Sequence, residues 1–307
     1  MENREIFAGV NSIKFNQRFK TDEDCYSYIA AIKWEQGYEC KKCGNTKFIP
    51  GKKLFSQRCS KCKYDESPTA GTVFDKIKFP ILIAFHIAFK ISTKKKGMSS
   101  LELSHEFELR QKTCWEFKWK IQQAMQSSLN YPLEGEIHVD ELWIGGPEEM
   151  KRGRSKGSKK LVVLALEKIP EGVGRAYAQV IESASAKEFR VFFSKHISTH
   201  AKIITDEWKG YGPLKKEYPG LEQRKSNDGN AFIDLHVHIM NLKGWLRGIH
   251  HHCSKDRLQG YLNEYHFRYN RRNNMNTIFD LLLKRMVLNK PIRLNMGISK
   301  GYLSAYT

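Results

Sequence analysis

Two short apolar stretches of the chain each carry an aspartate where a strand is expected. The stretch 136–144 has Asp140 at its middle, and the stretch 202–206 ends at Asp206. Carboxylates are rarely buried without a partner, and a hard divalent cation is one such partner. Because neighbouring strands lie about 4.8 Å apart, aspartates on adjacent strands can share such ions. The pair therefore predicts a Mg²⁺ or Mn²⁺ site, although Asp140 alone would more often mark an edge strand that faces water.

A third oxygen ligand is expected from a helix that packs across the same sheet. Asn241 lies 35 residues after Asp206. The helix around it has an apolar face that consists of Ile239, Leu242, Leu246 and Ile249. This position makes Asn241 the candidate third ligand. His236 and His238 flank it, and we interpret both first as structural or supporting residues.

Four of the seven cysteines form two pairs with the spacing of a zinc site. Cys40 and Cys43 are followed, after fifteen residues, by Cys59 and Cys62. Four thiolates hold zinc tetrahedrally and leave no open position, so the site is expected to be structural. The residues between the pairs favour two short strands, which predicts a zinc ribbon. Unligated core cysteines would require two such pairs by coincidence.

The composition points to a polyanionic partner. Lys and Arg number 52 and Asp and Glu 33, which gives a net charge of +19. Such an excess most often serves nucleic-acid binding, although ribosomal and membrane-surface proteins share it. No run of about 18 apolar residues is present, so we expect no membrane partner. An odd number of cysteines in a long basic chain favours a reducing compartment over a disulfide framework.

Basic residues near the proposed metal site are candidates for contacts with the DNA backbone. The glycine- and serine-rich loop 151–160 contains six cations and no acid, and a solvated loop is the simpler alternative. Further candidates follow on the helices after Asp206. The full set is Lys151, Arg152, Arg154, Lys156, Lys159, Lys160, Lys243, Arg247, Lys255, Arg268, Arg271 and Arg272.

Several separate sequence motifs, in order, resemble the ISXO-type insertion-sequence transposases. They are His138-Val139-Asp140-Glu141 before Gly145-Gly146, then Asp206 to Tyr211, Asn241 to Gly248 and Tyr265 to Arg272. The resemblance extends from about Phe15 to Arg272. It implies a ribonuclease-H-like α/β catalytic domain with a mixed sheet, of the type found in DDE transposases.

The expected elements agree with this family. Helices are predicted at 21–34, 80–91, 99–107 and 111–125, and the last two suit either a helix-turn-helix or a plain helical spacer. Strands at 136–144, 161–167 and 175–182, a helix at 186–196 and a strand at 202–206 follow. The expected parts are an N-terminal helical segment 1–35, a zinc ribbon 36–66, a helical DNA-binding region 67–130, the catalytic domain 131–275 and a C-terminal tail 276–307.

The resemblance implies cutting and joining of DNA by in-line phosphoryl transfer. Two Mg²⁺ or Mn²⁺ ions would be held by Asp140, Asp206 and Asn241. Hydrolytic nicking at the transposon ends would precede attack of the freed 3′-hydroxyls on target DNA. The implied partners are double-stranded transposon ends and target DNA, bound by a homodimer or larger assembly. The implied location is the bacterial cytoplasm, on the nucleoid.

The third position departs from the wider superfamily, which has glutamate where this chain has Asn241. An amide oxygen still ligates a hard cation but brings no charge, so weaker metal affinity is expected. Asp234, Glu207 and Glu141 are candidates for the missing acid, although regular alternation points Glu141 away from Asp140.

Asn241 also keeps alternative functions open. One is a captured, catalytically inactive transposase that acts as a zinc-containing DNA-binding regulator. Another is a nuclease or resolvase that cuts DNA without joining strands. Loss of function on replacing Asp140 separates the regulator from the transposase, and a strand-transfer assay separates the nuclease.

Overall fold

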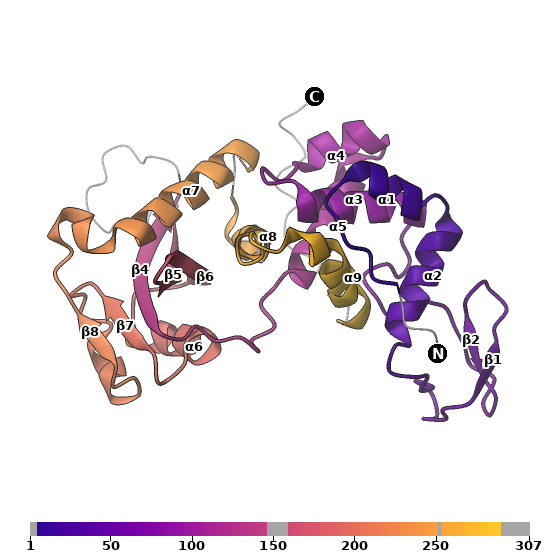
Figure 1. The fold of residues 1–307 in the computed structure, drawn as a ribbon, viewed down its shortest axis with the longest axis horizontal. Coiled ribbons are helices and arrows are strands. Elements are labelled where there is room, and N and C mark those ends of the chain that lie inside the picture. Colours follow the sequence, from indigo (N-terminus) through magenta and orange to yellow (C-terminus); the bar gives the residue numbers. More distant parts are fainter. Residues whose placement is uncertain (1–4, 146–158, 251–252, 290–307) are drawn as a thin grey trace. The chain divides into compact units, whose positions relative to one another are not determined.

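A computed structural model describes residues 5–145, 159–250 and 253–289, and it divides into two compact units. Unit 1 contains the chain up to Lys94, residues 100–124 and the segment that begins at Asn276. Unit 2 contains residues 95–99 and 125–275. Both ends of the described chain therefore contribute to unit 1 (Figure 1). Within these described ranges, no helix combines the length and apolar character that crossing a membrane requires.

Unit 1 is built from helices and a small sheet. The helices are α1 (Ser12–Arg18), α2 (Asp22–Lys33), α3 (Ile81–Thr93), α4 (Ser100–Phe107), α5 (Gln111–Ala124) and α9 (Ile278–Leu288). The antiparallel sheet has the order β1 (Phe48–Pro50), β2 (Gln57–Cys59) and β3 (Asp65–Glu66). The predicted start of α2 is confirmed, because Thr21 and Asp24 form a reciprocal capping box.

An aromatic core joins the first and last helices of unit 1. The ring of Phe15 stacks on Phe89 of α3 at 4.3 Å and meets Phe279 of α9 edge-on at 5.4 Å. The buried hydroxyl of Tyr28 on α2 donates a hydrogen bond to Asp280. Helix α9 falls in the segment 276–307 for which the sequence suggested only a tail, so this helix is a correction at the level of secondary structure.

Helices α4 and α5 form close to the predicted bounds. Three residues, 108–110, join them, and Glu108 takes a positive φ of 51° in this turn. The arrangement suits a helix-turn-helix. Whether it binds DNA stays a prediction, as does the expected five-part division of the chain.

Unit 2 is a five-stranded mixed sheet with the order β6-β5-β4-β7-β8. Its strands are β4 (Glu136–Ile144), β5 (Lys160–Ile169), β6 (Gly172–Ile181), β7 (Lys202–Thr205) and β8 (Leu221–Gln223). Strands β4, β5 and β6 pair antiparallel, whereas β7 runs parallel to both β4 and β8. The predicted α/β fold with a mixed sheet is confirmed, and only β8 had no predicted counterpart.

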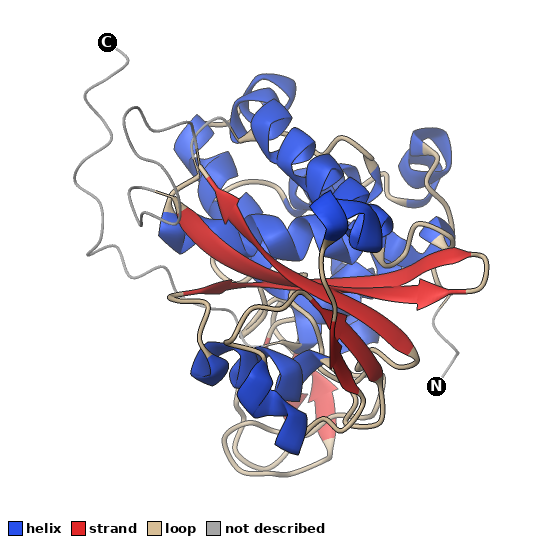
Figure 2. Cartoon of the chain, turned by 90° about the vertical axis from the view of Figure 1, so that its left-hand side faces the viewer, coloured by secondary structure: helices blue, strands red, loops and turns tan. Residues whose placement is uncertain are grey.

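Helices cover both faces of this sheet (Figures 1 and 2). Helix α6 (Ala186–His196) packs on one face through Phe189, Phe192 and Phe193. Helices α7 (Ile233–Ile249) and α8 (Lys255–Tyr269) pack on the other face.

The edge strand β6 is covered by side chains from α8 and the residue after it. Gln259 accepts a hydrogen bond from the Val180 backbone N–H at 2.9 Å. Asn270 accepts one from the Ala176 N–H at 2.8 Å and donates to the Ala176 carbonyl at 2.9 Å. These contacts satisfy backbone groups that an open sheet edge would leave unpaired.

Candidate active site

Side-chain alternation on β4 points Asp140 at helix α7. Ile137 and Val139 belong to the core under α6, whereas Leu142 and Ile144 belong to the core under α7. Asp140 shares the parity of the second pair. It is half-buried, and its Oδ1 accepts a hydrogen bond from the Glu141 N–H at 2.8 Å. The predicted alternation of this strand is therefore present.

The register of β4 and β7 brings Asp206 beside Asp140. The two parallel strands pair Val139 with Thr205, and the next residue along each strand is an aspartate. Ile204 packs under α7, so Asp206, two residues later, continues on the same face. Its Oδ1 accepts a hydrogen bond from the Trp208 N–H at 3.0 Å, which turns the chain directly after β7.

Tyr211 lies beneath this pair of aspartates. Its buried hydroxyl donates to Glu141 Oε2 at 2.9 Å, and its ring stacks on Phe189 at 4.3 Å. Burial raises the pKa of Tyr211 well above its ordinary value, and the nearby carboxylates of Glu141, Asp140 and Asp206 raise the pKa further. Three carboxylates therefore gather around one buried phenol, which stays protonated.

The loop from Asp206 to Tyr211 is held tightly in place. The Trp208 indole N–H donates to the Ala184 carbonyl at 2.8 Å. A Cβ on Gly210 would come within 2.7 Å of that same carbonyl oxygen, so only glycine fits there. The part of the motif from Trp208 to Tyr211 therefore has a structural role, because it holds the end of β7, and with it Asp206, in place.

Helix α7 brings His236 and Lys243 toward Asp140. His236 Nε2 lies 3.5 Å from Asp140 Oδ2. Burial lowers the pKa of Lys243, the carboxylate of Asp140 raises it, and the charges of Arg247 and Lys159 lower it. Lys243 therefore lies near Asp140, and Arg247 and Lys159, two further predicted DNA-contacting residues, lie near Lys243.

Asn241 occupies another side of α7. It is exposed, and among the contacts that the structure describes none joins it to Asp140 or Asp206. Five residues along an α-helix turn the direction of a side chain by about 140°, so Asn241 points away from the side that carries His236. Asn241 as a metal ligand stays a prediction, and its helix phase does not support it.

The three candidates for the missing acid lie in different surroundings. Asp234 forms an ion pair with Lys168, so its carboxylate charge is already balanced. Glu207 is exposed beside Asp206. Glu141 lies on the α6 side of the sheet, where Tyr211 binds it. His238, by contrast, is buried against His266 with their Nε2 atoms 3.2 Å apart, as expected of a structural residue.

The four paired cysteines meet in the ribbon as predicted. Their Sγ atoms all lie within 4.8 Å of one another, with Cys40 and Cys62 at 3.5 Å and Cys43 and Cys59 at 3.6 Å. Tetrahedral zinc with bonds of about 2.3 Å separates its sulfurs by roughly 3.8 Å, so the cluster fits the ion. Burial raises the pKa of the Cys59 thiol, but N–H donors from Cys62 and Lys61 outweigh it and lower the value to about 6.

Two family models match the chain. Residues 132–270 match the ISXO2-like transposase domain, and residues 20–65 match the transposase zinc-ribbon domain. Together the matched residues make up more than half of the chain.

The chain belongs to the ISXO-type transposases. Among solved structures, a chain of the "Crystal structure of a pre-cleavage Mos1 transpososome" is 12% identical, with 64% of this chain and 76% of that chain covered, at a TM-score of 0.29. A TM-score this low establishes no shared arrangement, and the assignment rests on the two family models. A search of curated proteins found no match.

The remaining predicted DNA contacts of the transposase have varied positions. Lys160 is half-buried at the start of β5, and Lys255 pairs with Glu182. Arg268 is buried in an ion pair with Glu264 at 2.7 Å, which favours a structural role. Arg271 and Arg272 lie over the rings of Phe267 and Tyr269. Outside the described residues lie Lys151, Arg152, Arg154 and Lys156.

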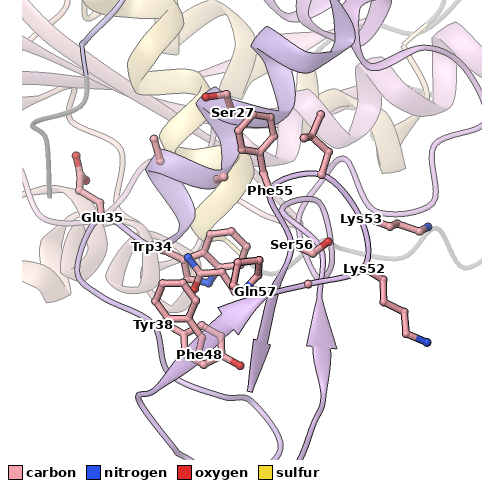
Figure 3. A pocket seen from close by; sticks show the side chains of 15 residues that line it. Ser27, Trp34, Glu35, Tyr38, Phe48, Lys52, Lys53, Phe55, Ser56 and Gln57 are labelled. Carbon is pink, nitrogen blue, oxygen red and sulfur yellow. The ribbon is translucent and has the colours of Figure 1, made fainter. Parts of the chain in front are cut away.

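The transposase also has a groove in unit 1 that the sequence did not suggest. Its volume is about 810 Å³, and it lies between α2 and the β1–β2 hairpin. Figure 3 shows Trp34, Tyr38 and Phe48 grouped on one wall, with Lys52 and Lys53 extending outward from the hairpin. Aromatic residues distributed over two segments carry no local spacing signal, which is why sequence reasoning missed this surface.

Proposed function

We propose that this transposase cuts and joins DNA by metal-dependent phosphoryl transfer at Asp140 and Asp206. One observation supports the proposal above all others. The parallel register of β4 and β7 makes the two aspartates neighbours on the same face of the sheet.

The residues fit a hard divalent cation. Two half-buried carboxylates on adjacent strands provide the oxygen donors that Mg²⁺ and Mn²⁺ prefer. Bound ions would activate water or a 3′-hydroxyl and stabilise the leaving oxygen. The protein's own part is to hold both carboxylates in fixed positions, and it does so through the Trp208 and Glu141 N–H donors.

The cations around Asp140 would position the DNA strand. Lys159, Lys243 and Arg247 lie close enough to one another to influence the Lys243 pKa. Clustered cations are costly unless an anion joins them, and a DNA phosphate is such an anion. We assign these three residues to the backbone next to the scissile bond.

Recognition of the transposon ends is assigned to unit 1. Its ribbon presents Lys52 and Lys53, and its helices α4 and α5 have the spacing of a helix-turn-helix. Pairing two ends requires two active sites, so we propose that the transposase works on DNA as a homodimer or larger assembly.

A second candidate function is a DNA-binding regulator without catalysis. The observation that supports this alternative is that α7 places a histidine, His236, beside Asp140 where DDE transposases are expected to have a carboxylate. A regulator would keep its DNA affinity when Asp140 is replaced.

The deciding experiment is a cleavage and strand-transfer assay on DNA that carries the element's own ends, with Mg²⁺ or Mn²⁺. We expect Asp140→Asn and Asp206→Asn each to reduce both reactions by at least about 100-fold, because a lost ligand costs more than a lost supporting residue. Glu171→Gln, the same chemical change at an exposed turn, serves as the control and should keep wild-type rates. End binding without metal-dependent cutting by the wild type would favour the regulator.

A further inference from the structure

The imidazole of His236 is held beside the carboxylate pair. Its Nε2 lies 3.5 Å from Asp140 Oδ2, and its ring packs near Phe232, one turn earlier, with centroids 6.3 Å apart. Phe232 is buried and also contacts His138 on β4 edge-on at 5.5 Å. The start of α7 is thereby fixed to the strand that carries Asp140, and His236 is directed at the site.

Both side chains are partly exposed to solvent. The side chain of His236 is 40% exposed and that of Asp140 is 25% exposed. Their separation exceeds the usual 2.7–3.2 Å of an N–H···O hydrogen bond and lies within the range of an ion pair. Two donors to one octahedral ion, each about 2.1 Å from it, stand roughly 3 Å apart, a spacing that a small side-chain rotation would give.

His236 and Asn241, the alternative donor, point in different directions around the axis of α7. Lys243, seven residues later, returns to within about 20° of His236, which agrees with its electrostatic interaction with Asp140. Asn241 lies about 140° away on the same helix. Position 236 thus lies on the side of α7 that faces Asp140, which is where the spacing argument placed position 241.

We propose that His236 supplies the third protein donor to the ion held by Asp140 and Asp206, a proposal that rests on the function proposed above. An imidazole nitrogen is a softer, uncharged ligand in place of an acid. Its presence shifts metal preference from Mg²⁺ toward Mn²⁺ and later first-row ions. The site of this transposase is therefore two carboxylates and an imidazole.

The test measures Mn²⁺ bound to the full-length, zinc-loaded protein without DNA. Electron spin-echo spectroscopy of Mn²⁺ detects a directly coordinated ¹⁴N, and titration gives the dissociation constant. We expect a nitrogen signal in the wild type, no such signal in His236→Ala, and affinity reduced by about 10-fold or more. His200→Ala, a change at an exposed histidine of the same unit, should keep both signal and affinity.

Two further variants separate this proposal from the proposed function. Asn241→Ala should leave signal and affinity unchanged, and His236→Glu should abolish the nitrogen signal and raise Mg²⁺ affinity. Two outcomes would overturn the role of His236 and leave the aspartate site intact. One is Mn²⁺ binding that depends on Asp140 but shows no ¹⁴N coupling, and the other is Mn²⁺ binding that is lost in Asn241→Ala. Mn²⁺ binding that is indifferent to Asp140→Asn would overturn the metal site itself.

Discussion

Tyr211 supports the two aspartates proposed to be catalytic from inside the protein. Its hydroxyl meets Glu141, and its ring is stacked on Phe189 of α6. The tyrosine thus ties the loop after β7 to β4, the two elements whose register sets the distance between Asp140 and Asp206. At the scale of single residues, part of the motif is proposed to serve the chemistry, and part holds those residues in position.

Removing this hydroxyl should destabilise unit 2. Tyr211→Phe keeps the ring but removes the hydroxyl that donates to Glu141, and hydrogen bonds to charged groups contribute about 1.5–3 kcal/mol. We expect a loss of that size in the free energy of unfolding, measured by urea denaturation. Tyr131→Phe, at a 64% exposed side chain, should change stability by less than about 0.5 kcal/mol. Equal effects of the two changes would contradict this role.

The sequence predicts the position of a site residue where that position depends only on neighbouring residues. Alternation on a strand predicts the face of Asp140, and two cysteine pairs predict a zinc cluster. The proposed third donor depends on the angle at which α7 crosses the sheet and on which side of the helix then faces Asp140. That angle is set by packing of Phe232, Leu235 and Leu242 against distant strands. Counting residues does not supply this angle, so the spacing predicts position 241, whereas the helix phase brings His236 to Asp140.

The zinc ribbon is an element with almost no core of its own. Its buried cluster contains only Trp34, Tyr38, Cys40 and Cys59, with Ala30 and Cys62 packed against it. Strands of two or three residues cannot bury enough apolar surface to be stable alone. The ion must supply that stability.

Cys59→Ser should therefore remove both the zinc and the ribbon. We expect about one zinc per chain in the wild type and none in the variant, measured by plasma mass spectrometry. Hydrogen exchange in β2 should rise to unprotected rates in the variant. Cys253→Ser, in unit 2, should retain full zinc content, and retention of zinc by Cys59→Ser would exclude this cysteine as a ligand.

Helix α6 carries a buried histidine that makes unit 2 sensitive to acid. His196 stacks on Tyr177 of β6 with ring centroids 4.7 Å apart, and burial lowers the pKa of His196 to about 4. An unfolded histidine has a pKa of about 6.5. Because the folded pKa is the lower one, stability is complete above about pH 6.5 and falls as the pH drops toward 4.

His196→Phe should weaken this pH dependence. The slope of unfolding free energy between about pH 6 and 4 should fall by up to about 1.4 kcal/mol per pH unit. The slope should not vanish, because burial also lowers the pKa of His266 to about 4 and that of His238 to about 3. Hydrogen exchange of the β5 amides measures unit 2 alone. His200→Phe, at an exposed site, should leave the slope unchanged, and an unchanged slope in His196→Phe would refute the assignment.

Elements with a strong local pattern were predictable and the others were not. Strand β4 and helix α6 have the bounds that the sequence predicts. Strand β8 has only three residues and needs β7 as its partner. Helix α9 has a clear apolar face, but its place in the core of the first helices is a long-range property that no local spacing contains.

The whole molecule has one unit inserted into the sequence of the other. Residues 125–275 interrupt unit 1, whose core is completed by α9. Phe279 is fully buried, and its ring meets those of Phe7, Phe15, Phe19, Phe85 and Phe89. The last described helix is thus a central part of the unit to which we assign end recognition.

Phe279→Ala should destabilise unit 1 by about 3–5 kcal/mol, since a large buried ring leaves a cavity. Hydrogen exchange in α3 should report the loss. Leu288→Ala, at the 60% exposed end of the same helix, should stay within about 0.5 kcal/mol of the wild type. Similar effects at both positions would show that α9 contributes through helix propensity and not through packing.

This interruption also sets the order in which a ribosome can complete the protein. Synthesis runs at about 5–20 residues per second, so on the order of 10 s passes between α5 and α9. During that interval Phe7, Phe15 and Phe89 lack a partner that is still to be translated. The nascent chain can complete unit 2, which is proposed to cut DNA, before unit 1, which is proposed to recognise the transposon ends. Translation that stops after residue 275 would therefore release a chain that has all of unit 2 but lacks α9, the helix that completes the core of unit 1.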